Sequence, residues 1–155
     1  MRGYTMQLRG FKFISDYENK EIVLPTRKTQ YSAGYDIAAA EDVLLAPATV
    51  TLVPTGIKAY MQPDEYLGIH IRSGLSIKNH LSLMNGQGII DADYFNNADN
   101  EGHIFIAIYN HNLQHVTISK GTRIAQGIFY KYLLAEMDEN NSFLPRTGGF
   151  GSTGE

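Results

Sequence analysis

The sequence predicts an all-β domain of barrel or jelly-roll type. Apolar residues recur with a period of two rather than 3.6 along most of the chain, as strands require. Turn-forming residues separate the short apolar runs at regular intervals. Helical patterning is confined to one short candidate within residues 73–83.

Length and composition limit the number of domains and the classes of function that are possible. A chain of 155 residues makes one domain, and its 43% of apolar residues suffice for a core. The formal net charge of -3 argues against a dedicated double-stranded nucleic-acid binder, which normally carries a basic excess. The absence of cysteine excludes disulfides, thiolate zinc sites and a cysteine nucleophile, and is compatible with a reducing cytoplasm. No apolar run approaches the roughly 20 residues that span a bilayer, so we expect no membrane association.

Two segments show the alternation most clearly. From Tyr66 to Arg72, leucine and isoleucine occupy every second position. From His103 to Asn110, three isoleucines share one face, and Phe105, Ala107 and Tyr109 share the other. A strand that is apolar on both faces is buried on both, and a second subunit is one candidate cover for the outer face.

Further short strands are expected at 43–45, 50–53, 56–60, 116–118 and 123–132. After Met137 the composition changes to polar, turn-forming residues, and the chain then ends in a glycine-rich stretch. We therefore predict a folded body over residues 1–137, followed by a tether and a flexible arm over 138–155.

The glycine-rich arm has the makings of an anion site. Four of the 15 glycines lie in the last eight residues, and their exposed amides can wrap a phosphate. Ser152 and Thr153 add hydroxyl donors, Arg146 adds a fork suited to phosphate oxygens, and Phe150 can stack on a flat ring. The alternative, which composition alone favours, is a disordered tail.

Two internal segments carry comparable groups. Arg72, Ser73 and Gly74 open the only helical candidate, where free amides and an arginine make a generic phosphate site. Between Asn85 and Tyr94, two glycines allow a wide hairpin, and a carboxylate such as Asp91 can act as a general base for water. Read in isolation, the first segment is better explained as a helix start with Ser73 as its N-cap, and the second as a polar hairpin end with solvated aspartates.

Two single residues also have two possible interpretations each. Asp36 is either a turn carboxylate or a partner of metal-bound water, and Gln126 is either a phosphate ligand or a surface glutamine. The five histidines show no zinc-ligand spacing.

Taken together and in order, these segments resemble the five motifs of the trimeric dUTP pyrophosphatase (dUTPase) family, in the bacterial or phage form of Gram-positive hosts. The resemblance extends from about Ile22 to the end of the chain. The segments are residues 33–37, 72–78, 85–94, 121–126 and 146–154.

The resemblance implies a jelly-roll β-barrel that assembles as a homotrimer with shared active sites. It implies hydrolysis of dUTP to dUMP and pyrophosphate in the cytoplasm, which keeps uracil out of DNA and supplies dUMP. It also implies Mg²⁺ carried on the triphosphate, with no direct protein ligand and with Asp36 reaching the ion at most through water.

The resemblance further assigns roles to single residues. Asp91 would activate the water that attacks the α-phosphorus, and Tyr94 would pack under the deoxyribose and exclude a ribose 2′-hydroxyl. Asn85, with the backbone of Gly88 to Ile90, would read the uracil edge, and Phe150 would stack over the base. The residues implied to hold phosphates are Arg72, Ser73, Gly74, Gln126, Arg146, Gly151, Ser152 and Thr153.

The chain departs from the family pattern in two places. The turn over residues 95–103 is longer than usual, and Thr122 stands where an aspartate is common. The longer turn leaves the contacts beyond the sugar undefined.

Two alternatives follow. A dCTP deaminase of the same fold needs a glutamate on the strand after the hairpin, whereas residues 104–109 hold no acidic residue and Glu101 precedes them. A bifunctional enzyme fails for the same reason. A nucleotide-gated partner of a repressor-type protein would use the turn 95–103 as its contact.

Overall fold

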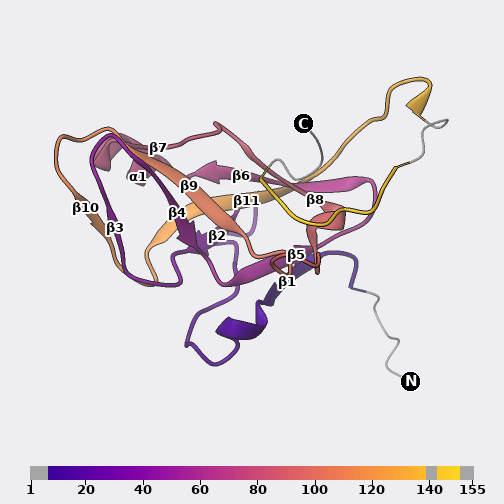
Figure 1. Cartoon of the computed structure of the whole chain (residues 1–155), viewed down its shortest axis with the longest axis horizontal. Helices are drawn as coiled ribbons and strands as arrows, with labels where there is room; N and C mark the ends of the chain where they lie inside the picture. The colour runs from indigo at the N-terminus through magenta and orange to yellow at the C-terminus, as the bar shows by residue number, and fades with distance from the viewer. Residues whose placement is uncertain (1–6, 139–142, 151–155) are drawn as a thin grey trace.

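The computed structural model describes residues 7–138 and 143–150 (Figure 1). Strands make up most of the regular secondary structure in these residues, and the expected all-β class is confirmed. The strands are β1 Gly10–Phe13, β2 Tyr35–Ala38, β3 Val43–Leu45, β4 Val50–Pro54, β5 Ile57–Tyr60, β6 Glu65–Ile71, β7 Leu81–Leu83, β8 Gly88–Asp91, β9 Phe105–Asn110, β10 Val116–Ile118 and β11 Arg123–Lys131. The helical elements are η1 Ser15–Tyr17, α1 Ser73–Asn79 and η2 Ala92–Tyr94.

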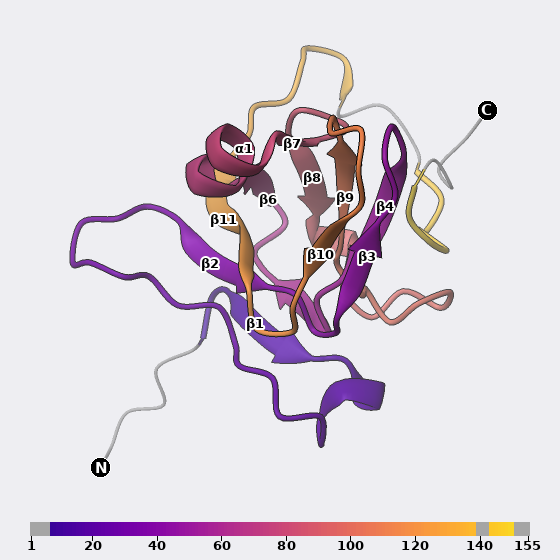
Figure 2. The ribbon, with the colours of Figure 1, turned by 90° about the vertical axis from the view of Figure 1, so that its left-hand side faces the viewer.

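The strands form four antiparallel sheets around a common interior (Figure 2). The largest has the order β2-β11-β6-β8, the next β4-β9-β7, and β1-β5 and β10-β3 complete the set. Neighbours in each sheet are mostly distant in sequence, as in jelly rolls rather than in meanders. β8 forms an edge of the largest sheet, so one side of its backbone has no strand partner in the described part of the chain.

The core follows the alternation in the sequence. Ile104, Ile106 and Ile108 are each 0% exposed, and Leu67 and Ile69 of β6 pack in the same cluster. The opposite face of β9 is apolar but only partly covered within one chain, because Phe105, Ala107 and Tyr109 are all of intermediate exposure. That face is therefore available to contribute to a pocket or to a second chain.

Helix α1, the one α-helix among the described residues, is shorter than the sequence pattern indicates. It ends at Asn79 because His80 adopts a left-handed backbone with φ of 51°, and the chain then continues as β7. Arg72, rather than Ser73, occupies the N-cap, and its side chain makes no capping hydrogen bond. The period-two burial of Leu81 and Leu83 overrides the weak helical pattern at this point.

The N-terminal region adds elements that the sequence did not predict. β1 pairs with β5, and η1 follows directly. The segment around Asp36, for which no strand was predicted, forms strand β2 and pairs with β11. Within the described residues, no helix is long and apolar enough to cross a membrane.

The described part of the C-terminal arm, residues 143–150, lies against the body. The backbone N–H of Asp99 donates to the carbonyl oxygen of Thr147 at 3.2 Å. The arm therefore meets the turn between η2 and β9. The boundary between body and arm at residue 138 stays a prediction.

Candidate active site

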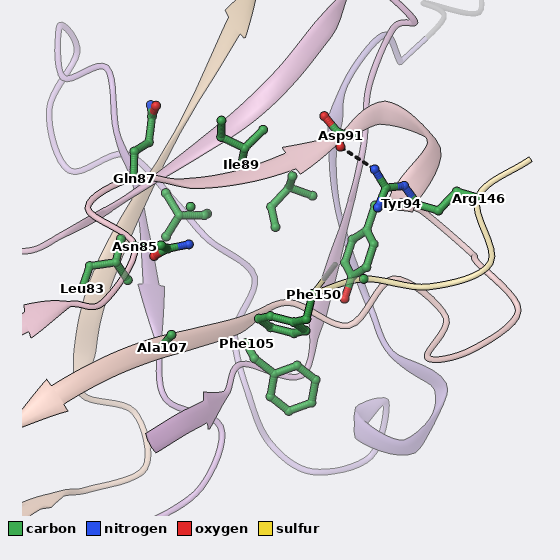
Figure 3. Close-up of a pocket in the computed structure, with 14 residues that line it drawn as sticks. Leu83, Asn85, Gln87, Ile89, Asp91, Tyr94, Phe105, Ala107, Arg146 and Phe150 are labelled. Carbon is green, nitrogen blue, oxygen red and sulfur yellow. Dashed lines mark hydrogen bonds and ion pairs between the residues drawn. The ribbon is translucent and has the colours of Figure 1, made fainter. Parts of the chain in front are cut away.

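A cavity of about 380 Å³ lies between the β7–β8 hairpin, β9 and the arm (Figure 3). Its size is within the usual range for small-ligand sites. The predicted site residues that line it are Asn85, Gly88, Ile90, Asp91, Tyr94, Arg146 and Phe150.

The hairpin stays open because its two strands belong to different sheets. β7 pairs with β9, whereas β8 pairs with β6, so β7 and β8 do not bond to each other. Gly86 makes the turn with φ of 70°. The free edge of β8 presents peptide N–H and C=O groups, and Asn85 and Gln87 add side-chain amides to the cavity lining. This arrangement suits a flat ring with donors and acceptors on its edge.

Asp91 ends β8 at the mouth of the cavity, and its side chain is 50% exposed. Arg146 of the arm donates from Nη2 to Oδ2 of Asp91 at 2.5 Å and from Nε to Oδ1 of Asp93 at 2.8 Å. The arginine is itself only 14% exposed. A guanidinium held between two carboxylates is well placed to transfer to a stronger anion that enters beside them.

Tyr94 forms one wall of the cavity and is 6% exposed. Burial raises the pKa of its phenol, so the hydroxyl stays protonated at neutral pH. Gly149 lies against the ring, because a Cβ at that position would sit 2.7 Å from Cε2 of Tyr94. The next residue, Phe150, packs beside Phe105 of β9, with the two ring centroids 6.4 Å apart (Figure 3).

The remaining predicted phosphate residues form a second group elsewhere. Arg72, Ser73 and Gly74 stand at the start of α1, and Gln126 pairs with Asp36 across β11 and β2. Asp36 accepts a hydrogen bond from Nη1 of Arg123 at 3.0 Å, and one of its oxygens lies 3.7 Å from Nε of Arg72.

These two groups are far apart within one chain. Asp91 lies opposite Tyr66 on β6, whereas Arg72 follows the far end of that strand, six residues on. At about 3.3 Å per residue the separation is roughly 20 Å. Figure 1 shows α1 and the end of β8 toward opposite ends of the molecule. One chain thus carries the expected site as two separate halves, the Asp91 group at the cavity and the Arg72 group at the start of α1. Gly151, Ser152 and Thr153 lie outside the described residues.

The cavity also includes residues that sequence reasoning missed. Phe105 and Ala107 come from the outer face of β9, and Leu83, Gln87 and Ile89 from the hairpin. The doubly apolar pattern of β9 was the available signal, but it does not distinguish a cavity wall from a subunit interface. Arg123 was missed as a partner of Asp36, since cross-strand pairs depend on register.

Comparison with known proteins agrees with this geometry. The family model described as dUTPase matches residues 20–154. The deoxyuridine 5'-triphosphate nucleotidohydrolase of Lactococcus lactis is 50% identical over 149 residues, covering 96% of this chain and 99% of that protein. The enzyme of the same name from Rickettsia conorii is 38% identical, with 91% and 95% covered.

Solved structures of dUTPases also resemble this chain in fold. The crystal structure of dUTPase from Streptococcus mutans has a TM-score of 0.79 at 44% identity, covering 82% of this chain and 98% of that one. A dUTPase variant of Staphylococcus bacteriophage 80alpha with dUpNHpp has a TM-score of 0.70 at 25% identity, with 96% and 99% covered. Matched over most of its length by sequence and by fold, the chain belongs to the dUTPase family.

Proposed function

We propose that this chain hydrolyses dUTP to dUMP and pyrophosphate. One observation carries the proposal: in a member of the dUTPase family, a carboxylate, an open strand edge and a buried tyrosine line a single cavity. A deaminase of this fold is not favoured, since β9 carries no acidic residue and Glu101 bonds to Lys58 instead.

In this proposal Asp91 acts as the general base. It takes a proton from water, and the water oxygen forms a bond to the α-phosphorus. The bond from that phosphorus to the bridging oxygen breaks, and pyrophosphate leaves with the electron pair. The half-exposed carboxylate at the cavity mouth allows both water and phosphate to reach it.

Selection of the nucleoside follows from the cavity walls. The free edge of β8 from Gly88 to Ile90, with Asn85, offers a fixed pattern of donors and acceptors to the uracil edge. The Tyr94 ring supports the deoxyribose and leaves no room for a 2′-hydroxyl. Phe150 covers the base from the arm.

Arg146 changes partners when substrate binds. Without an anion it pairs with Asp91 and Asp93, and a triphosphate of about four negative charges attracts it more strongly. Its transfer to the γ-phosphate frees Asp91 to accept a proton. The wrapping of the phosphates by Gly151, Ser152 and Thr153, which lie outside the described residues, is part of the same proposal.

The separation of the two groups supports a homotrimer with shared sites. A phosphate bonded to Arg72 lies too far from Asp91 of the same chain for one nucleotide to use both. A neighbouring copy that brings its Arg72, Ser73, Gly74 and Gln126 to this cavity completes the site. The partly exposed apolar face of β9 is consistent with such an assembly.

Mg²⁺ fits this site as an ion carried by the substrate. In the part of the chain that the structure describes, no three acidic or histidine side chains converge as a metal site. A triphosphate provides oxygen ligands, and the hard cation keeps several waters. The bound ion would neutralise phosphate charge. A water-mediated contact from Asp36 to the ion stays a prediction. In the structure that carboxylate binds Arg123.

The cytoplasmic setting and the removal of dUTP from DNA precursors belong to this same proposal. The repressor-type partner stays a prediction that no observation favours. The turn 95–103 directs several polar side chains inward, to hydrogen bonds within the chain.

The proposal is tested by pyrophosphate release from dUTP, dCTP, dTTP and UTP in the presence of Mg²⁺. We expect turnover of dUTP alone. Comparable turnover of dTTP or UTP, or deamination of dCTP, would overturn the assignment.

A further inference from the structure

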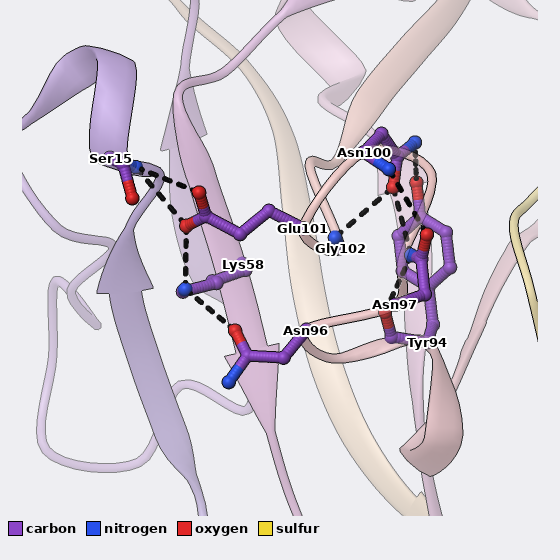
Figure 4. A network of polar contacts seen from close by, with 8 residues as sticks. All are labelled: Ser15, Lys58, Tyr94, Asn96, Asn97, Asn100, Glu101 and Gly102. Carbon is purple, nitrogen blue, oxygen red and sulfur yellow. Dashed lines mark hydrogen bonds and ion pairs between the residues drawn. The ribbon is translucent and has the colours of Figure 1, made fainter.

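The turn between η2 and β9, residues 95–103, is an ordered polar network (Figure 4). Oδ1 of Asn97 accepts from the backbone N–H of Asp99 and of Asn100, at 3.0 and 3.1 Å. Its Nδ2 donates to the carbonyl oxygen of Tyr94 and to Oδ1 of Asn100, both at 2.8 Å. The turn thus closes on the backbone of Tyr94, which is also a wall of the candidate active site.

The same network holds the far end of the Tyr94 ring. The Tyr94 hydroxyl donates to the carbonyl oxygen of His103 at 2.6 Å and accepts from Nδ2 of Asn100 at 2.8 Å. Oδ1 of Asn100 accepts from the N–H of Gly102 and from Asn97, so its amide nitrogen is the atom left to face the phenol. The ring is therefore fixed both at its backbone and at its hydroxyl.

A second set of contacts anchors the turn from outside. Nζ of Lys58 on β5 lies 2.6 Å from Glu101 and 2.7 Å from Oδ1 of Asn96, and this lysine is 9% exposed. Glu101 also accepts from the N–H of Ser15 at 3.1 Å. These contacts lower the pKa of Glu101, with the lysine bond as the largest cause. At Gly102, φ is 87°, and a Cβ would meet the carbonyl oxygen of Tyr94 at 2.8 Å.

The arm rests on the surface that this turn supports. Thr147 accepts from the N–H of Asp99, and a Cβ on Gly148 would meet Oδ2 of Asp99 at 2.9 Å. Gly149 lies on the Tyr94 ring itself. A shift of the ring would therefore move both the wall of the sugar site and the surface on which the arm closes.

We propose that Asn100 is a positioning residue that acts through the Tyr94 hydroxyl, fixing the ring tightly enough to discriminate dUTP from UTP. The inference rests on the proposed function and assigns a role to the turn that the hydrolytic chemistry leaves unexplained. The site can reject a substrate for one extra hydroxyl only if the Tyr94 ring is held rigidly in place. Without the Asn100 contact, the His103 carbonyl alone holds the hydroxyl, so the ring can tilt about that one hydrogen bond, and the 2′-hydroxyl of UTP then fits.

The test compares Asn100→Ala with wild type by kcat and KM for dUTP and for UTP. We expect the ratio of kcat/KM for dUTP over UTP to fall roughly five- to tenfold, the scale of one lost hydrogen bond. The change should come mainly from improved UTP turnover. Asn112→Ala is the matched control, since Asn112 makes equivalent hydrogen bonds at 2.8 Å to Asn79 and Asn110 away from the cavity, and it should leave the ratio unchanged.

A double-variant cycle separates positioning from a general structural effect. Tyr94→Phe removes the hydroxyl, so adding Asn100→Ala to it should change the ratio less than about twofold. An unchanged ratio in Asn100→Ala, or the full effect of Asn100→Ala in the Tyr94→Phe background, would overturn the inference. Asn100→Ser is the milder variant if Asn100→Ala does not fold, with the same expected outcomes. Wild type that fails to hydrolyse dUTP would instead refute the proposed function.

Discussion

Two inactive variants should complement each other if the active site is divided between chains. Asp91→Asn removes the proposed general base at the cavity, and Arg72→Ala removes a proposed phosphate ligand at the start of α1. Each variant alone should lack turnover. In a mixed oligomer, the Arg72→Ala copy still supplies Asp91, and the Asp91→Asn copy still supplies Arg72. A site formed between these two copies in that order therefore contains both groups.

The expected yield follows from symmetry and from the structure. The strand register separates the two residues by about 20 Å in one chain, so they serve one nucleotide only across an interface. A mixed cyclic trimer of either composition has one junction in the correct order. Mixed trimers should therefore recover about one third of the wild-type rate.

The assay uses co-expression of the two variants with different affinity tags. Purification over both tags isolates mixed trimers, and pyrophosphate release from dUTP measures their rate. Pure trimers of each variant give the baseline. A mixed preparation that is no more active than the two baselines would refute the division of the site between chains.

Two further predictions concern the arm and the turn. Truncation before Arg146 should lower kcat about a hundredfold or more while melting changes by less than about 2 °C, and an unchanged rate would remove the arm from the mechanism. His103 is buried, its ring Nε2 accepts from the N–H of Gly56 at 2.9 Å, and burial lowers its pKa. The unfolded chain therefore binds this proton more readily, so stability should decrease as pH falls below about 6.5 toward the folded pKa. The decrease should be smaller in His103→Gln, and melting curves with equal pH dependence in the two proteins would contradict it.

The alternation of residues predicted the fold class and the principal core face. The isoleucines of β9 are buried as expected, because a period of two gives a strand little choice of which face is covered. Short segments were less predictable. The helix ends early because His80 adopts a left-handed backbone and Leu81 is buried in the next strand. Both features depend on tertiary packing, which the local sequence does not show.

The site was predictable as a set of segments, but their grouping in space was not. The motif that contains Asp91 and the arm that contains Arg146 meet in one cavity, whereas Arg72 lies at another place. Strand pairing decides this, and no local pattern in the sequence reports it. The proposed role of Asn100 could not be read from the sequence for the same reason, since its contact with Tyr94 exists only once the turn closes.

In the proposed reaction, water activated by Asp91 attacks the α-phosphorus of dUTP. Turnover in ¹⁸O-labelled water tests it most directly, with mass spectrometry of both products. The label should appear in dUMP and not in pyrophosphate, and Asp91→Asn should bind a non-hydrolysable dUTP analogue without producing labelled dUMP. Label in pyrophosphate, or undiminished labelling of dUMP by Asp91→Asn, would contradict the account.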